Sequence, residues 1–145
     1  MYKIYLCGGM TGVSEDEQKQ WRKAVQNEVY QYVPQRSVEF FDPTEYGDIQ
    51  ANYFPNGQEA EEITMKLDLR KLAEADLVIC NISTNPVSVG TNMELGIAHN
   101  LQIPIVTYNP KNNELHPWQK AVSDFQTNDL ELLSEIVAEY YLHKS

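Results

Sequence analysis

The sequence is poor in positive charge. It has 11 lysine and arginine residues against 21 aspartates and glutamates, which gives a formal net charge of −10 at neutral pH. A field of this sign repels polyphosphates, so a nucleic acid polymer is not an expected partner. Backbone amides and a single hydroxyl can still bind one small phosphate group locally. The charge balance therefore favours small-molecule partners.

Long apolar runs are absent as well. No stretch has the length of a membrane span, and no basic segment followed by an apolar one precedes the first strand-like run. We therefore expect no membrane contact and a cytoplasmic location. There are only two cysteines, Cys7 and Cys80, and each lies in an apolar run. This setting favours buried, reduced thiols over a disulfide or a metal site.

Several familiar site motifs are missing. The glycine-rich segment 7–12, Cys-Gly-Gly-Met-Thr-Gly, matches neither the dinucleotide fingerprint nor the Walker sequence. There is no serine nucleophile elbow, and no cysteine and histidine cluster has metal-ligand spacing. Dinucleotide redox chemistry and ATP hydrolysis are thus disfavoured, and neither a cofactor nor a metal is predicted. Taken alone, the glycines indicate either a close backbone approach to a ligand or a plain turn.

What is present is an alternation of apolar segments of two kinds. The apolar content of 42% and the length of 145 residues suit one globular domain, without repeats or linkers. Strands are expected over 4–7, 38–41, 77–80 and 103–108, and helices over 14–33, 59–75, 90–102 and 129–143. Segment 48–57 is expected to be a surface loop. Residues 1–145 are therefore predicted to form a single-domain α/β fold, a doubly wound, flavodoxin-like parallel sheet flanked by helices.

In such sheets the ligand lies beyond the carboxyl ends of the strands. Three loops, over 8–12, 42–46 and 83–91, should therefore share the site. We expect Asp42 from the second loop and Gly90 at the start of the following helix to contribute to ligand binding.

Glu94 is the most informative residue. On a helix that starts at Gly90, it shares a side with Gly90, Ile97, Ala98 and Leu101. It also lies near the helix N-terminus, where the macrodipole helps to keep a carboxylate ionised. A buried carboxylate is costly unless it is paired or functional. A functional role is therefore favoured over a glutamate that is satisfied by neighbouring amides.

Asp68 presents the same pattern on the preceding helix, where it aligns with Leu72 and Ala75. From the residues alone, an aspartate bonded to Arg70 or Lys71 fits as well as a catalytic role. Two inward carboxylates near one sheet edge nevertheless match the need of retaining glycoside chemistry. That chemistry uses one nucleophile or cation stabiliser and one proton donor.

Three segments carry a resemblance to a known family: the opening run 4–10, the run 75–80, and segment 88–98 with its Gly-Thr-x-x-Glu-Leu-Gly. Together with the Asp68-Leu69 helix, they resemble the nucleoside 2-deoxyribosyltransferases over most of the chain, to about residue 124. The resemblance implies cleavage of the N-glycosidic bond of a 2'-deoxynucleoside and transfer of its 2-deoxyribosyl group to another nucleobase. Its partners are then a deoxynucleoside or deoxynucleotide and a free nucleobase.

The resemblance also implies roles for individual residues. Glu94 is the nucleophile that holds the sugar as a covalent ester, Tyr5 orients its carboxylate, and Asp68 handles the proton on the departing base. The family assembles as homodimers or larger homo-oligomers in which a neighbouring subunit completes the pocket. His116 falls where that contributed residue is expected. Residues that pack against base and sugar are Gly8, Gly9 and Met10.

One position departs from the transferase pattern. Six residues before Glu94, transferases carry an aspartate that contacts the sugar 5'-hydroxyl, whereas this chain has Ser88. A serine beside a helix start can donate to a 5'-phosphate that an aspartate repels. This resembles the 2'-deoxynucleoside 5'-monophosphate N-glycosidase branch, in which water takes the sugar. Transfer, hydrolysis and a non-catalytic nucleotide-binding module all stay open.

Overall fold

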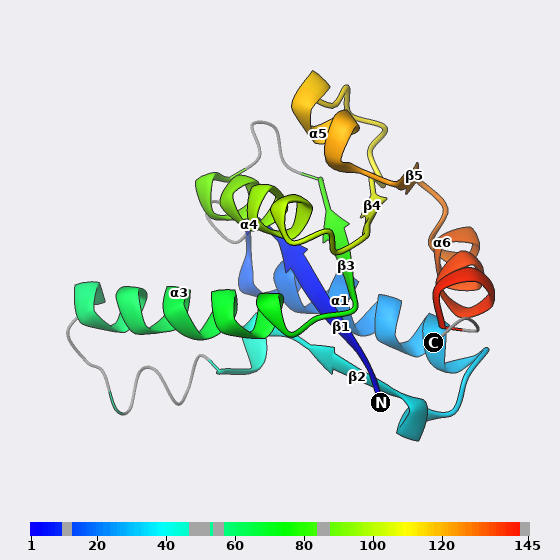
Figure 1. Ribbon diagram of the computed structural model, residues 1–145, viewed down its shortest axis with the longest axis horizontal. Coiled ribbons are helices and arrows are strands. Elements are labelled where there is room, and N and C mark those ends of the chain that lie inside the picture. The colour runs from blue at the N-terminus through cyan, green and yellow to red at the C-terminus, as the bar shows by residue number, and fades with distance from the viewer. Residues whose placement is uncertain (10–12, 47–52, 54–56, 84–87, 143–145) are drawn as a thin grey trace.

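The computed structural model describes residues 1–9, 13–46, 53, 57–83 and 88–142. Within them, five parallel strands form one sheet in the order β2-β1-β3-β4-β5 (Figure 1). The strands are β1 (Tyr2–Gly8), β2 (Val38–Phe41), β3 (Leu77–Asn81), β4 (Ile105–Tyr108) and β5 (Phe125–Thr127). The predicted doubly wound α/β fold is confirmed.

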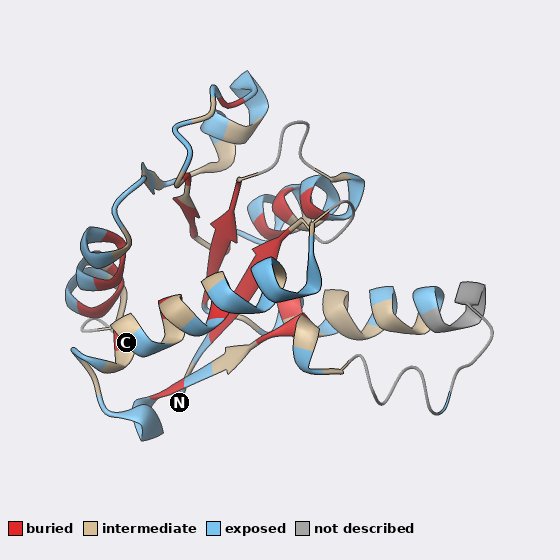
Figure 2. Ribbon diagram, turned by 180° about the vertical axis from the view of Figure 1, so that it is seen from behind, coloured by how far each residue is buried: buried red, intermediate tan, exposed pale blue. Residues whose placement is uncertain are grey.

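Helices cover both faces of the sheet. On one face, α1 (Glu15–Tyr30) and α6 (Leu130–Ile136) pack on one set of strand residues, and α6 continues as a π-helix over Val137–Leu142. On the other face, α3 (Gly57–Ala73) and α4 (Val89–Asn100) pack on the alternate set. Figure 2 shows that the buried residues concentrate in the central strands and on the inner sides of the helices.

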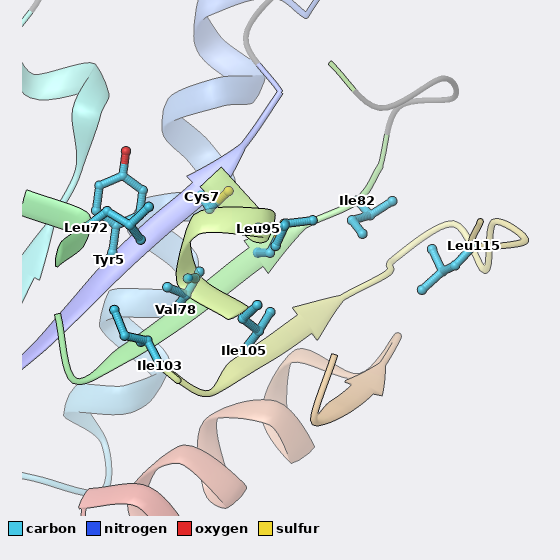
Figure 3. Packing of buried hydrophobic residues seen from close by; sticks show 11 residues of the cluster. Tyr5, Cys7, Leu72, Val78, Ile82, Leu95, Ile103, Ile105 and Leu115 are labelled. Carbon is cyan, nitrogen blue, oxygen red and sulfur yellow. The ribbon is translucent and has the colours of Figure 1, made fainter. Parts of the chain in front are cut away.

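The two-residue period of β1 explains how one strand serves both faces. Ile4 and Leu6 join the core under α1 and α6, whereas Tyr5 and Cys7 join the core under α3 and α4. Figure 3 shows Tyr5 and Cys7 on this second face, together with Leu72 of α3 and Leu95 of α4. Residues 5 and 7 therefore face the two helices that carry the candidate carboxylates.

The ends of the predicted elements shift for local reasons. Helix α1 starts at Glu15 rather than at residue 14, because Ser14 caps the helix and its hydroxyl accepts a hydrogen bond from the Glu17 amide at 3.2 Å. It ends at Tyr30, before Pro34, rather than at residue 33. Strand β4 begins at Ile105 rather than at residue 103, because Pro104 has no N–H to donate to a ladder.

The sequence patterns missed two short elements near the end of the chain. Helix α5 (Pro117–Val122) follows β4 and lies beyond its carboxyl end (Figure 1). Strand β5 has three residues and no buried one, so it shows no apolar alternation. Two short 3-10 helices, Gln35–Ser37 and Pro43–Tyr46, flank β2.

The two cysteines are free and buried, as expected, and they lie in register on neighbouring strands, with Cys7 of β1 opposite Cys80 of β3. The surface loop expected over 48–57 falls largely outside the described residues. In the part of the chain that the structure describes, no helix combines the length and the apolar character that a membrane crossing requires.

Candidate active site

Tyr5 lies at the centre of the candidate site and is fully buried. Its ring stacks on Phe41 of β2 with the centroids 5.4 Å apart, and Phe41 stacks in turn on Tyr46. The Tyr5 hydroxyl has no hydrogen-bond partner among the described residues. In Figure 3 the hydroxyl points away from the apolar side chains around the ring. A phenol held rigidly in this way presents one polar atom in a fixed direction.

Glu94 lies at the border of the buried face of α4. The buried residues of this helix are Thr91, Leu95 and Ala98, whereas Gly90 and Leu101 are exposed. The prediction that Gly90 and Leu101 share an inward stripe with Glu94 is therefore wrong. The buried stripe is rotated by about one residue, because α3 and α5 rather than the sheet alone set which side of α4 is covered. Glu94 is half-buried, and its Oε2 atom is buried without a hydrogen-bond partner in the described chain.

The surroundings of Glu94 raise the pKa of its carboxyl toward neutral pH. Burial is the main cause that raises the pKa of Glu94 to about 7. The neighbouring Tyr5 hydroxyl and the charge of Arg22 oppose this rise, and the charge of Asp68 adds to it. Burial, and then the charges of Glu94 and Asp68, raise the pKa of the Tyr5 hydroxyl, which therefore stays protonated. The Tyr5 hydroxyl and the Glu94 carboxylate are close neighbours, although no hydrogen bond of ordinary geometry forms between them.

Asp68 approaches the same point from α3. It is half-buried on the side of the helix that also carries the buried Leu72, as predicted. Burial raises the pKa of Asp68 to about 6, and the charge of Arg22 opposes the rise. Within the described residues Asp68 forms no ion pair with Arg70 or Lys71, and Lys71 instead approaches Glu74 at 4.0 Å. The structure therefore does not support the alternative in which Asp68 is bonded to Arg70 or Lys71.

Arg22 of α1 is the residue of this region that the sequence patterns missed. It is fully buried and donates hydrogen bonds to the carbonyls of Gln18, Leu6 and Gly8. The helical spacing indicates an inward position for this residue, because Arg22 lies three and seven residues before Val25 and Val29, which are both buried. An arginine in an apolar stripe is more often a surface residue whose stem alone is covered, so the pattern does not single out Arg22.

Asp42, a predicted binding residue, is buried beneath the surface of the site. Its Oδ1 atom lies 3.6 Å from Nε of Arg22 and accepts hydrogen bonds from the amide and hydroxyl of Thr44. Its Oδ2 atom is buried without a partner among the described residues. Its side chain is 1% exposed. In this structure Asp42 therefore supports Arg22 and the turn after β2.

The glycines after β1 have different surroundings. A Cβ atom at Gly8 would lie 2.7 Å from the Trp21 ring, so the missing side chain makes room for the packing of α1 on β1. Gly9 follows the strand and is half-buried. Met10, which was predicted to contact the substrate, lies outside the described residues. The glycine at position 8 is thus explained by a helix contact before any ligand is considered.

Ser88 caps the helix that carries Glu94. Its hydroxyl oxygen accepts a hydrogen bond from the Thr91 amide at 3.3 Å and donates one to the Thr91 hydroxyl at 2.8 Å. Gly90 is exposed, and the space where its side chain would stand is open. The start of α4 therefore combines an exposed surface with backbone amides at the positive end of a helix dipole.

His116 lies apart from Tyr5, Asp68 and Glu94. It caps α5, is exposed, and its Nδ1 atom accepts a hydrogen bond from the Trp118 amide at 3.1 Å. Gln119 of the same helix donates to Asn92 of α4 at 3.2 Å. The contacts that the structure gives for His116 stay within α5, so the structure does not bring it to the carboxylates of its own chain.

The geometry thus assembles two half-buried carboxyl groups and one buried phenol on three elements. The carboxyls titrate near neutrality, so that one can be ionised while the other carries a proton. No group of three potential metal ligands occurs in the part of the chain that the structure describes. An ionised carboxylate beside a proton-bearing one can attack an electrophilic carbon and protonate its leaving group.

Comparison with known proteins gives one family. A family model described as "Nucleoside 2-deoxyribosyltransferase" matches residues 4–136. No sequence among the curated proteins matches the chain.

Solved structures share the fold at low identity. A 2-deoxyribosyltransferase from Bacillus psychrosaccharolyticus is 20% identical, with a TM-score of 0.69 over 95% of this chain and 91% of that chain. A conserved protein from Enterococcus faecalis is 16% identical, with a TM-score of 0.72 over 93% of this chain and 96% of that one. A CMP N-glycosidase from Clostridium botulinum is 18% identical, with a TM-score of 0.54 over 92% and 97%.

Proposed function

The chain belongs to the nucleoside 2-deoxyribosyltransferase family, and we propose that it cleaves the N-glycosidic bond of a 2'-deoxynucleoside and transfers the 2-deoxyribosyl group to another nucleobase. The observation that carries the proposal is the half-buried Glu94, whose pKa of about 7 leaves it partly ionised at neutral pH beside the buried Tyr5 hydroxyl. Such a carboxylate is a suitable nucleophile for an electron-poor anomeric carbon.

The reaction proceeds in two steps. In the first, a Glu94 oxygen forms a bond to the anomeric carbon, the bond from that carbon to the base nitrogen breaks, and its electron pair leaves with the base. Asp68 delivers the proton that the departing base takes up. In the second, a nitrogen of another free nucleobase attacks the anomeric carbon, Glu94 leaves as a carboxylate, and Asp68 recovers a proton. Tyr5 holds the carboxylate of Glu94 in its attacking orientation, and no cofactor is needed.

Substrate binding is proposed for residues around this centre. Gly9, Met10 and the backbone of Gly8 contact the base and sugar, and Gly90 allows close approach at the start of α4. Asp42 contributes through Arg22 rather than by direct contact, because its side chain is buried.

A homodimer or larger homo-oligomer is part of the proposal. His116 would act in the site of a neighbouring subunit, where its exposure leaves it available. Exposed apolar side chains occur on α5 and on the neighbouring start of α4: Trp118, 81% exposed, and Val89 and Met93. Burial of these apolar side chains against a second copy would be favourable.

A second candidate is hydrolysis of a 2'-deoxynucleoside 5'-monophosphate, with water in place of the second base. The observation that favours it is Ser88, a neutral hydroxyl at the N-terminus of α4 where the transferase pattern has an aspartate. The proton of Ser88 is donated to Thr91, so a phosphate would bind the helix amides first and the hydroxyl after it rotates.

One set of incubations separates these functions. Deoxynucleosides and their 5'-monophosphates are supplied with and without a second free base, and the products are separated by chromatography. Transfer predicts a new deoxynucleoside that forms only with the second base. Hydrolysis predicts free base and deoxyribose 5-phosphate from the monophosphates in either case. Binding of these compounds without any product would identify a non-catalytic module and reject both candidates.

Ser88→Asp in the same assay tests how the 5'-position is read. Aspartate caps helices as well as serine, so the fold should survive the change. If the start of α4 binds a 5'-phosphate, the variant should shift the ratio of specificity constants toward unphosphorylated substrates by about 1–3 kcal/mol. Ser88 would not bind a phosphate if the wild-type protein already prefers the unphosphorylated nucleoside and the variant has the same ratio of specificity constants.

The pH dependence of kcat/KM should be a narrow bell. The reaction needs Glu94 ionised and Asp68 protonated, whereas their pKa values are about 7 and about 6, so the reactive form is a minority species. The maximum should lie near pH 6.5, midway between these two values. Initial rates over roughly pH 4.5 to 9 measure the profile. In Asp68→Asn the descending limb should disappear. A flat wild-type profile over this range would contradict the proposed pairing.

A further inference from the structure

Three aromatic rings form a continuous stack that ends at the candidate site. The centroids of Tyr5 and Phe41 are 5.4 Å apart and their planes differ by 20°, and those of Phe41 and Tyr46 are 5.3 Å apart with planes that differ by 22°. Tyr5 and Phe41 are partners in the register of β1 and β2. Tyr46 ends the 3-10 helix that follows β2. The stack therefore leads from a half-buried turn to the fully buried phenol of Tyr5.

The turn that carries Tyr46 is held by the buried Asp42. One carboxylate oxygen of Asp42 accepts hydrogen bonds from the amide of Thr44 at 2.9 Å and from its hydroxyl at 2.6 Å. The carbonyl of Asp42 accepts another hydrogen bond from the Glu45 amide at 3.1 Å. These bonds fix the backbone between Phe41 and Tyr46, so the third ring has a defined place against the second.

The hydroxyl of Tyr5 depends on the packing of its ring for its direction. It is buried and forms no hydrogen bond with any described residue, so no polar contact in that part of the chain holds it. The Oε2 atom of Glu94 is buried and unpartnered in the same way, and the next residue of α4, Leu95, belongs to the same hydrophobic cluster as Tyr5. Helix α4 also contacts β1. Two buried polar atoms thus come from neighbouring elements, and ring packing orients one of them.

We propose that Phe41 and Tyr46 are positioning residues of this site, whose rings hold the ring of Tyr5 so that its hydroxyl stays directed at the Glu94 carboxylate. The inference rests on the proposed function and deepens it, because it names the groups behind the phenol that orients the nucleophile. Neither ring needs to touch the substrate. A displacement of about 1 Å at the reacting groups can lower turnover by on the order of a hundredfold, so a loosened stack should be visible in kcat.

Phe41→Leu removes the middle ring and keeps an apolar side chain. We expect kcat to fall by about tenfold or more with KM nearly unchanged, because the change acts on attack and not on substrate binding. Tyr46→Leu should act in the same direction, whereas Tyr46→Phe keeps the ring and should retain wild-type turnover. The control is Phe40→Leu, the same change at the preceding residue, whose ring packs on the other face of the sheet with its centroid 5.4 Å from that of Tyr30. This control should leave kcat unchanged.

A double-mutant cycle with Tyr5→Phe separates positioning from a general loss of packing. Tyr5→Phe keeps the first ring of the stack but has no hydroxyl to direct. In this background Phe41→Leu should lower kcat by less than about twofold. An equally large effect of Phe41→Leu in both backgrounds would mean that the stack has a structural role only, and the inference would be wrong.

A second measurement needs no turnover. Protein that carries carbon-13 at the ζ position of its tyrosines is titrated by NMR, and Tyr5→Phe identifies the signal of Tyr5. This signal should shift as Glu94 ionises, and the shift should be absent in Glu94→Gln. In Phe41→Leu the shift should shrink to less than about half, because the effect of a charge falls with distance. In Phe40→Leu it should keep its wild-type size.

A Tyr5 signal that ignores the ionisation of Glu94 in the wild-type protein, or that responds equally in Phe41→Leu, would overturn the inference. If Phe41→Leu does not fold, as judged by circular dichroism, Tyr46→Leu decides by the same measurements. A protein that is inert on every substrate would reject the proposed function, whereas the role of the stack would still be judged by the titration.

Discussion

Glu94→Gln should lower turnover by at least about a hundredfold and should make the protein more stable at alkaline pH. The loss of turnover follows because an amide oxygen carries no charge and cannot form the ester with the sugar. Glutamine has nearly the same shape, so the packing of α4 is kept. Rates with saturating deoxynucleoside, together with the circular dichroism spectrum, measure the first effect. Near-normal turnover in a folded Glu94→Ala protein would end the proposed mechanism.

The stabilisation follows from the direction of the pKa shift. Burial raises the pKa of Glu94 from 4.5 to about 7, so the folded chain holds this proton more tightly than the unfolded chain does. The associated stability is complete below pH 4.5 and is lost as pH rises through about 7. Glutamine avoids this loss. At pH ~8 the variant should therefore gain about 2–3 kcal/mol in the free energy of unfolding, and little at low pH.

Denaturant unfolding at both pH values tests this second effect. Glu135→Gln, an exposed position on α6, is the matched control, and it should change neither turnover nor stability appreciably. Equal stability of wild type and Glu94→Gln at alkaline pH would mean that Glu94 is ionised at little cost in the folded chain.

Asp68→Asn should slow the cleavage of natural deoxynucleosides by roughly a hundredfold or more, because asparagine has no proton to give to the leaving base. A deoxyriboside with an activated leaving group, such as nitrophenolate, needs no such proton and should lose much less. The ratio of the two losses is therefore the diagnostic quantity, measured as kcat/KM on each substrate. Asp16→Asn, an exposed position on α1, provides the control with the same chemical change.

An equal loss on both substrates would assign Asp68 to sugar positioning or to structure instead. Glu94→Gln offers the internal contrast, because removal of the nucleophile should slow both substrates alike. The two variants together thus separate attack from protonation, and the proposed division of labour requires them to differ.

The layered fold was predictable because its signals are local. Ile4 to Cys7 and Leu77 to Cys80 are continuous apolar runs, and a strand covered on both faces requires such a run. The first helix was predicted from residue 14 and begins at Glu15, with Ser14 as its cap. By contrast, β5 and α5 are short and largely exposed, so their positions depend on pairing with β4 and on contacts with α4, which no local pattern encodes.

The two carboxylates of the candidate site could be predicted from the sequence, whereas the buried arginine near them could not. Glu94 and Asp68 could be found because a carboxylate on an apolar helix side is rare. Their shared neighbour Arg22 could not be assigned, because its partners Gly8 and Asp42 lie 14 and 20 positions away along the chain and meet it only through the sheet. The helical periodicity also predicted that Gly90 faces inward, whereas it is exposed, because contacts with α3 and α5 decide which side of α4 is covered.

The contact between Gly8 and Trp21 has a consequence for how this chain can evolve. A Cβ atom at position 8 would lie 2.7 Å from the indole, so a glycine and a large ring occupy one shared space. A side chain can enter at position 8 only in a lineage that has first reduced the residue at position 21. Descendants of this sequence should therefore exchange the two positions as a pair, with the smaller residue at 21 arising first.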